Sequence, residues 1–239
     1  MTHPSLIEKK SQAGFTLVEL AIVMIIIGLL IGGVLKGQEL IGNAQIAATS
    51  AQVKAYDTAT TTFNDIYDGL PGDLTTPAVR IPNCAAAPCA VVGDGSNTVG
   101  AAPGGAQAAG SENVTYWVQL NAADLLTGIE PTRGLVIGGV YPEAEAGGGF
   151  QMGYHPGGAL ANNAAAFRGH YVVISANPAT AVGASALTAS QAARLDRKLD
   201  DGASDTGSVF ADGATCDAAA GVYNEAVQGS TCDLFFRIQ

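Results

Sequence analysis

A single carboxylate, Glu19, stands inside the apolar run from Phe15 to Leu35, and Gly14 immediately precedes that run. An ionisable side chain within a membrane-spanning stretch is costly and marks a functional site whose partner should be sought. A suitable partner is the α-amino group of Phe15 on a neighbouring copy, which cleavage after Gly14 would free. The residues therefore predict two linked events, cleavage of the Gly14–Phe15 peptide bond and formation of an amine–carboxylate ion pair.

The apolar run Phe15–Leu35 is long enough to cross a bilayer. At about 1.5 Å per residue, a helix of this length spans roughly 30 Å, which is the thickness of one hydrocarbon core. Lys9 and Lys10 precede the run and favour an N-terminal end that stays in the cytoplasm. A secretory signal peptide would have a shorter apolar region with its cleavage site after it. A plain anchor helix is a further alternative, but it leaves Glu19 unexplained.

The string Gly-Phe-Thr-Leu-Val-Glu-Leu at residues 14–20, followed by this apolar run, resembles the processing site and N-terminal helix of type IV pilins and of type II secretion pseudopilins. In that family prepilin peptidase, a membrane enzyme, cuts after the glycine and usually methylates the new N-terminal phenylalanine. The family glutamate then pairs with that amine as subunits enter a helical filament. The resemblance implies that Gly14 precedes the cut, that Phe15 becomes the N-methylated terminus and that Glu19 is the filament-assembly carboxylate.

Four cysteines indicate an oxidising compartment. An even number of cysteines in an exported chain predicts disulfides, and four cysteines allow three connectivities. Proximity in the sequence favours Cys84–Cys89 and Cys216–Cys232. A zinc site is the alternative because the first pair has ligand-like spacing, although the second pair is too widely separated to match. Pilin-type subunits often close a C-terminal loop with a disulfide, so the resemblance also implies the Cys216–Cys232 pair.

The charge balance bears on partners and ligands. The chain carries 11 basic and 21 acidic residues, a formal charge of −10, which argues against direct nucleic-acid binding. An acidic cluster after a predicted helix raises the alternative of a bound Ca²⁺, an ion that takes oxygen ligands. The spacing is not that of an EF-hand, so we favour a solvated acidic turn and predict neither a cofactor nor a metal. The cluster consists of Asp196, Asp200, Asp201 and Asp205.

Enzymatic function is not predicted. The histidines outside the leader are His155, expected in a loop before Pro156, and His170, expected in a strand. The sequence contains no G-x-S-x-G, H-E-x-x-H or P-loop motif. The glycines at 147–149 lack the strand and helix context of a phosphate-binding loop.

The N-terminal helix is predicted to continue to Asp68, because no proline interrupts residues 15–68. Its second half is expected to bury an apolar or small face against the globular domain. Gly69 and Pro71 then provide a stop, with Gly69 suited to the left-handed C′ position. The expected buried face consists of Leu40, Ala44, Ala48, Ala51, Ala55, Ala59, Phe63 and Ile66.

Further elements follow from local signals. Residues 71–110 are expected to be irregular, and residues 112–126 are expected to form a helix with Ser111 as N-cap and Trp117 in the core. Thr188 and Gln191 form a capping-box pattern that predicts a helix ending near residues 200–202. Strands are predicted at 135–141, 170–176 and 234–238.

The predicted fold is α+β: a long N-terminal helix, transmembrane in its first half, packed on a C-terminal antiparallel sheet as in pilins. The expected parts are a leader at 1–14, a transmembrane helix at 15–35, its amphipathic continuation at 36–69 and an exported domain at 70–239.

The predicted function is a structural subunit of a type IV pilus or pilus-like filament. A secretion pseudopilin is the alternative within the family, and a membrane-tethered binding or adhesin domain is the alternative outside it. Expected partners are prepilin peptidase, further pilin subunits and the inner membrane. The domain would lie in the periplasm before assembly, and then at the cell surface or in a periplasmic pseudopilus.

Overall fold

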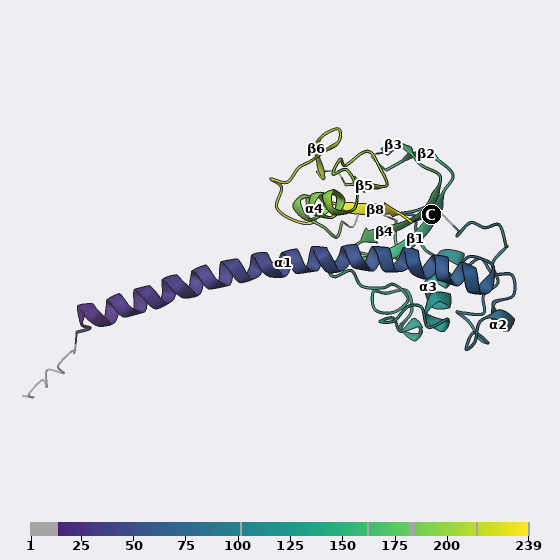
Figure 1. The fold of residues 1–239 in the computed structure, drawn as a ribbon, viewed down its shortest axis with the longest axis horizontal. Helices are drawn as coiled ribbons and strands as arrows, with labels where there is room; N and C mark the ends of the chain where they lie inside the picture. Colours follow the sequence, from purple (N-terminus) through teal and green to yellow (C-terminus); the bar gives the residue numbers. More distant parts are fainter. Residues whose placement is uncertain (1–13, 101, 162, 182–184, 214, 239) are drawn as a thin grey trace, which may run out of the picture. The chain divides into compact units, whose positions relative to one another are not determined.

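The computed structural model describes residues 14–238 except 101, 162, 182–184 and 214 (Figure 1). Most of the predicted leader, with Lys9 and Lys10, therefore lies outside the described residues. The chain forms two compact units, residues 1–43 and 44–239, and the boundary falls within one helix. The predicted domain boundaries at residues 35 and 69 stay predictions.

Helix α1 runs from Leu17 to Tyr67, close to the predicted limits. Tyr67 is followed by Asp68, which adopts the left-handed conformation at φ +47° and donates its N–H to the Asn64 carbonyl at 2.8 Å. The left-handed residue is therefore Asp68, and not Gly69 as predicted. Gly69 is needed for space instead, because a Cβ there would lie 2.7 Å from Leu74 Cδ2. The Leu74 side chain thus packs closely against the backbone at Gly69, just after the end of α1.

The buried face of residues 44–67 differs from the predicted one. Ala44, Ala51, Ala55 and Ile66 are exposed, and the domain instead packs on a face with larger side chains. The Tyr56 ring lies 5.2 Å from Trp117 and 4.9 Å from Phe150, both edge-on. These rings bury far more apolar area than alanines would, so they determine which face is covered. The buried set is Ile46, Thr49, Ser50, Val53, Tyr56, Ala59, Thr60 and Phe63.

The predicted buried face does not include the polar residues of this face, because their hydrogen-bond partners lie far along the chain. Thr49 Oγ1 accepts the Ala146 N–H at 2.9 Å, 97 residues away. Thr60 Oγ1 bonds to the Tyr116 hydroxyl inside the core. Buried polar groups are tolerated when they are hydrogen-bonded, so threonine is as suitable here as an apolar residue.

Residues 71–110 are largely irregular, as predicted, with only the short helix α2 at Pro77–Arg80. Carboxylates order part of this region. The buried Asp73 carboxylate accepts the N–H groups of Gly95, Ser96 and Asn97 at 2.7, 3.2 and 2.7 Å. Glu112 accepts two further N–H groups, from residues 94 and 100. The loop is therefore held by internal acceptors rather than by secondary structure.

Helix α3 spans Glu112–Ala122 and ends four residues before the predicted limit. Ser111 occupies the N-cap position, but its side chain makes no capping bond. The helix ends early because Asp124 takes a left-handed conformation at φ +58°, and Leu125 then donates its N–H to the Leu120 carbonyl at 3.0 Å. The prediction for Trp117 is confirmed, since its side chain is fully buried.

The main sheet is antiparallel and has the order β1-β4-β8-β5. Its strands are β1 (Gly149–His155), β4 (Gly169–Ser175), β8 (Asp233–Arg237) and β5 (Val209–Asp212). The strands predicted at 170–176 and 234–238 are confirmed within a residue. Two small hairpins accompany the sheet: β2 (Gly158–Leu160) with β3 (Asn163–Ala166), and β6 (Asp217–Ala219) with β7 (Val222–Tyr223).

Both faces of the main sheet are covered. One face joins the large core, and its neighbours Val172 and Phe236 pair directly across β4 and β8. The opposite face forms a second cluster from Tyr171, Val173, Phe210 and Phe235, with Leu160 of β2 packed against it. Phe210 and Phe235 stack with ring centroids 5.2 Å apart. Burial on both sides explains why β4 reads as a continuous apolar run instead of alternating.

The strand predicted at 135–141 is wrong. The segment turns after the 3₁₀ helix η1 (Pro131–Arg133), and only an isolated bridge links Ile137 with Tyr141. Gly138 has φ +71°, and a Cβ on Gly139 would lie 2.4 Å from the Gly134 carbonyl. Gly138 and Gly139 therefore form a tight turn, and the β-forming residues on either side of them do not form a strand.

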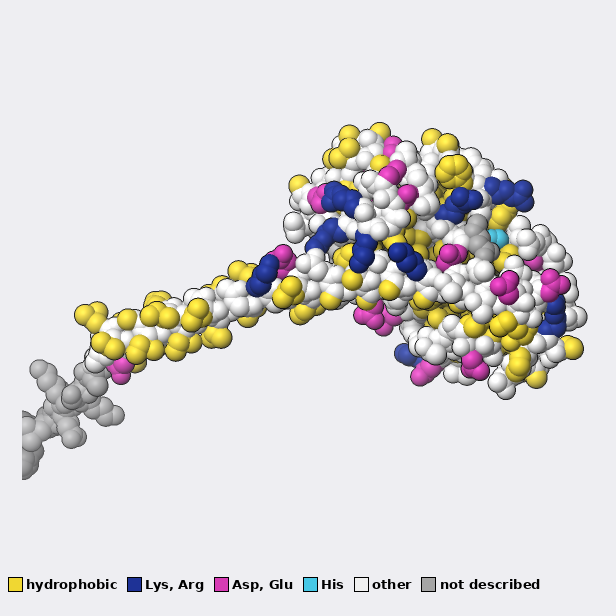
Figure 2. All heavy atoms as spheres, in the orientation of Figure 1, with side chains coloured by type: hydrophobic (Ala, Val, Ile, Leu, Met, Phe, Trp, Pro, Cys, Tyr) yellow, Lys and Arg dark blue, Asp and Glu magenta, His cyan; other side chains and the backbone are white. Residues whose placement is uncertain are grey.

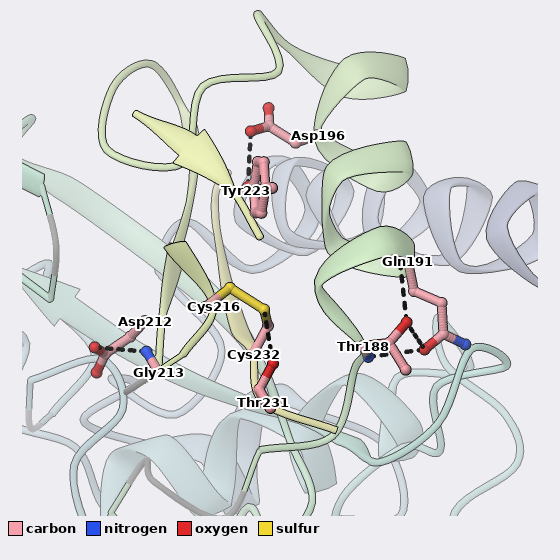
Figure 3. Close-up of a disulfide and its surroundings, with 9 residues drawn as sticks. All are labelled: Thr188, Gln191, Asp196, Asp212, Gly213, Cys216, Tyr223, Thr231 and Cys232. Atoms are coloured by element: carbon pink, nitrogen blue, oxygen red, sulfur yellow. Dashed lines mark hydrogen bonds between the residues drawn. A yellow bond between two sulfur atoms is a disulfide. The ribbon is translucent and has the colours of Figure 1, made fainter. Parts of the chain in front are cut away.

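Helix α4, Ala189–Leu199, begins with the predicted capping box. The Gln191 N–H donates to Thr188 Oγ1 at 3.2 Å, and the Thr188 N–H donates to Gln191 Oε1 at 2.9 Å (Figure 3). The helix ends at Leu199 with Asp200 as C-cap, where it was expected to stop.

Candidate functional site

The residues on either side of the predicted cut are open. Gly14 and Phe15 are both exposed, Phe15 to 84% of its surface, and helix α1 begins only at Leu17. A Cβ added to Gly14 would meet no atom within 4 Å. The glycine is therefore not required by the fold of its own chain, so a requirement for it would have to come from a partner.

Glu19 takes part in the start of helix α1. Its Oε2 accepts both the backbone N–H and the hydroxyl of Thr16, each at 2.8 Å. The Glu19 N–H in turn donates to Thr16 Oγ1 at 3.2 Å. This reciprocal pair is a capping box with Thr16 before the helix and Glu19 in its first turn. The T-x-x-E spacing of Thr16 and Glu19 is the sequence signal for this capping box. The prediction from the sequence rested on the charge of Glu19 in an apolar run and did not include the capping box.

The N-terminal part of α1 presents apolar side chains to its surroundings. From Leu17 to Leu35 its large hydrophobic residues are 43–87% exposed, and Figure 2 shows them as yellow side chains along the helix with an acidic one near its beginning. This is the one described helix that is long and apolar enough to cross a membrane. Exposure of so much apolar surface requires lipid or other subunits to cover it.

The four cysteines form the disulfides Cys84–Cys89 and Cys216–Cys232, the pairing favoured by proximity. The second disulfide closes the loop that carries β6 and β7 (Figure 3). Cys232 also pairs with Leu187 through a backbone bridge just before α4. All four side chains are buried. The disulfides therefore tie loops to the core and are not a surface site.

The predicted acidic cluster is only partly assembled. Asp196, Asp200 and Asp201 bring carboxylate oxygens within 4.8 Å of one another, whereas Asp205 lies apart beside Gly221. Asp200 accepts bonds from Ser208 and Val209, and Asp201 accepts bonds from Ala203 and Thr206. Hydrogen bonds from the chain itself thus account for the positions of these carboxylates. A similar triad of Asp73, Asp94 and Glu112 is likewise bonded to loop N–H groups.

Asp196 differs from its neighbours because it is fully buried. Its Oδ2 accepts the Tyr223 hydroxyl at 2.8 Å (Figure 3). Its Oδ1 accepts the Gly202 N–H at 3.2 Å. Burial raises the pKa of this carboxyl to about 6, against the smaller opposing effect of the Tyr223 hydrogen bond. The bond from Tyr223 fastens the disulfide-closed loop to helix α4.

This carboxyl should make stability depend on pH. The folded state holds its proton up to about pH 6, whereas an unfolded aspartate loses it near pH 4, so stability contributed by Asp196 falls as pH rises between these values. The full loss is about 3 kcal/mol at most. We expect Asp196→Asn to remove this fall, measured by urea unfolding of the full chain in detergent with Trp117 fluorescence at pH 4 to 7.

Comparison with wild type is needed because His170 titrates in the opposite sense. Burial lowers the pKa of His170 to about 4, so its contribution to stability rises as pH rises toward 6.5. The contribution of His170 is the same in both proteins, so it cancels when the free energy of unfolding of Asp196→Asn is subtracted from that of wild type at each pH. A difference that stays constant from pH 4 to 7 would contradict the assignment.

The two histidines lie in strands. His170 is in β4, as predicted, but His155 is the last residue of β1 and not a loop residue, because β1 extends up to Pro156. The Val99 N–H donates to His170 Nε2 at 3.2 Å, and His155 lies 6.4 Å from the Tyr171 ring. Both imidazoles are therefore packed within the domain.

The long helix followed by an antiparallel sheet is a pilin-like α+β arrangement. Residues 9–35 match the family model described as a prokaryotic N-terminal methylation motif, the signature of type IV pilins and pseudopilins. The motif implies processing by prepilin peptidase and assembly into multi-subunit filaments, and the proteins that carry it are structural subunits. No curated protein and no solved structure matches the chain.

Proposed function

We propose that this chain is a structural subunit of a type IV pilus or pilus-like filament, cleaved by prepilin peptidase after Gly14 and methylated at Phe15. The observation that carries the proposal is the methylation-motif match at residues 9–35. The exposure of Gly14 and Phe15 before the start of α1 supports it, because a peptidase needs an extended, accessible substrate. Cleavage there leaves the whole apolar helix in the mature subunit.

Assembly would proceed through the first turn of α1. Glu19 in a lipid environment costs free energy, and an amine on a neighbouring Phe15 offsets that cost by forming an ion pair. Because Glu19 holds a fixed position in the first turn of α1 and Phe15 lies just before that helix, the pair also sets the register between subunits. The apolar residues from Leu17 to Leu35 would then pack against those of neighbouring helices.

The compartment follows from the same features. Before assembly, the helix would cross the inner membrane once and the domain would lie in the periplasm. Two disulfides suit that oxidising compartment. After assembly the domain would face the cell surroundings as part of a pilus.

The test is intact-mass spectrometry of material sheared from the surface of native cells. A species that begins at Phe15 and carries the mass of one added methyl group would establish a processed pilus subunit. Processed protein confined to the membrane fraction would identify a secretion pseudopilin or a minor subunit instead. An uncut chain in that membrane fraction would contradict the proposal and favour a tethered binding domain.

A further inference from the structure

An open pocket of about 310 Å³ lies in the second unit. Its walls come from the end of α1, the loop before α3, strand β1 and the start of β4. A volume of this size is at the lower end for small-molecule sites and suits a ligand of about one sugar ring. Its principal lining residues are Asn64, Leu70, Asn97, Tyr154, Arg168 and His170.

Arg168 gives the pocket a positive centre in an acidic protein. It is the one charged residue that lines the pocket, while the chain as a whole carries a formal charge of −10. Its Nε donates to the Tyr154 hydroxyl, and its guanidinium lies 5.7 Å from the centre of the Tyr154 ring. Among the described residues no carboxylate pairs with Arg168. An oriented guanidinium with open N–H groups fits a carboxylate in a bidentate manner.

The other walls offer neutral hydrogen-bonding groups. Because the Val99 N–H donates to His170 Nε2, that nitrogen carries no proton. Burial lowers the pKa of His170 to about 4, so near neutral pH the ring is uncharged with its proton on Nδ1. The side-chain amides of Asn64 and Asn97 add donors and acceptors. Such groups match the hydroxyls of a sugar.

The pocket is held in shape before any ligand arrives. Asn97 has a left-handed backbone at φ +61°, and its N–H is fixed by the buried Asp73 carboxylate at 2.7 Å. Asn64 is part of helix α1, and the Tyr154 and His170 rings lie 5.2 Å apart on adjacent strands. Preformed walls reduce the entropy lost on binding.

We propose that this pocket binds one carboxylate-bearing sugar unit, either as a free sugar acid or as the terminal unit of a glycan. Arg168 receives the carboxylate, His170 and the two asparagines receive hydroxyls, and the Tyr154 ring provides an apolar wall. The proposal goes beyond the filament function and does not depend on it, because every residue involved lies in the second unit.

The experiment is a ligand-observed NMR titration of the full chain in detergent micelles at pH 7, with glucuronate as the probe and glucose as its neutral match. We expect glucuronate to bind at least about tenfold more tightly than glucose, since a charged hydrogen-bonded pair is worth that much. Arg168→Gln should remove the difference, and Arg133→Gln, at an exposed arginine outside the pocket, should retain it. Arg168→Lys, which keeps the charge but not the fork, should bind with intermediate affinity.

Several results would overturn the proposal. These are equal binding of glucuronate and glucose, unchanged glucuronate binding by Arg168→Gln, or binding of acetate as tightly as glucuronate. Trp117 fluorescence reports whether each variant is folded. If Arg168→Gln does not fold, the glucuronate affinity of Arg168→Lys tests the proposal instead. A disaccharide ending in glucuronate identifies the source: tighter binding than the free acid indicates a glycan, and weaker binding indicates the free acid.

Discussion

Replacing Gly14 with valine is expected to leave the chain uncut when it is co-produced with prepilin peptidase. The added side chain meets nothing in the chain itself, since a Cβ at this position has no neighbour within 4 Å. Any loss of cleavage therefore arises from the fit to the peptidase, where extra methyl groups in a confined subsite lower the rate at least about tenfold. Intact-mass spectrometry of the membrane fraction measures the cut and uncut species directly.

The matched control is Gly32→Ala, at a helical glycine that likewise has no atom within 4 Å of an added Cβ. This variant should be cut as efficiently as the natural chain. Full cleavage of Gly14→Val would show that the scissile bond lies elsewhere, and the assignment of Phe15 as the new terminus would fail with it.

The second large effect is expected at Glu19, where two variants separate two roles. Glu19→Ala removes both the charge and the capping box with Thr16, whereas Glu19→Gln removes the charge and can keep the box. If the carboxylate pairs with a neighbouring amine, both variants should insert in the membrane, remain folded and lose most filament yield. The measurement is the amount of sheared filament relative to the amount of subunit in membranes.

Glu39→Gln is the control for Glu19, because Glu39 is an exposed glutamate of the same helix and its partner is Lys36 at 2.7 Å. Its filament yield should match that of the natural chain. A Glu19→Gln variant that assembles normally while Glu19→Ala fails would assign Glu19 to helix capping alone. Normal assembly of both would remove Glu19 from the mechanism.

Sequence reasoning was successful where the signal is local. The capping box at Thr188 and the long proline-free helix depend on neighbouring residues, and both are found within a residue or two of their predicted positions. The short spacing of the cysteines likewise favoured the pairing that the structure contains. The methylation motif is also local, which is why Gly14, Phe15 and Glu19 stand out in the amino-acid sequence alone.

The features that could not be predicted from the sequence depend on contacts between residues far apart in the chain. Strand β1 contains two glycines and no β-branched residue, so its sequence gives little indication of a strand, and its pairing with β4 determines it. The buried face of α1 was misjudged because Thr49 and Thr60 gain their partners only in the folded domain. The Arg168 pocket was missed for the same reason, since its walls lie up to about a hundred residues apart in the sequence.

The position of β8 has a consequence for how the domain is made. Strand β8, Asp233–Arg237, lies between β4 and β5, although both are synthesised before it. Until residues 233–237 have left the ribosome, β4 and β5 each have an unpaired edge, which favours pairing with other chains. The four-stranded sheet therefore cannot be completed until most of the domain has been synthesised.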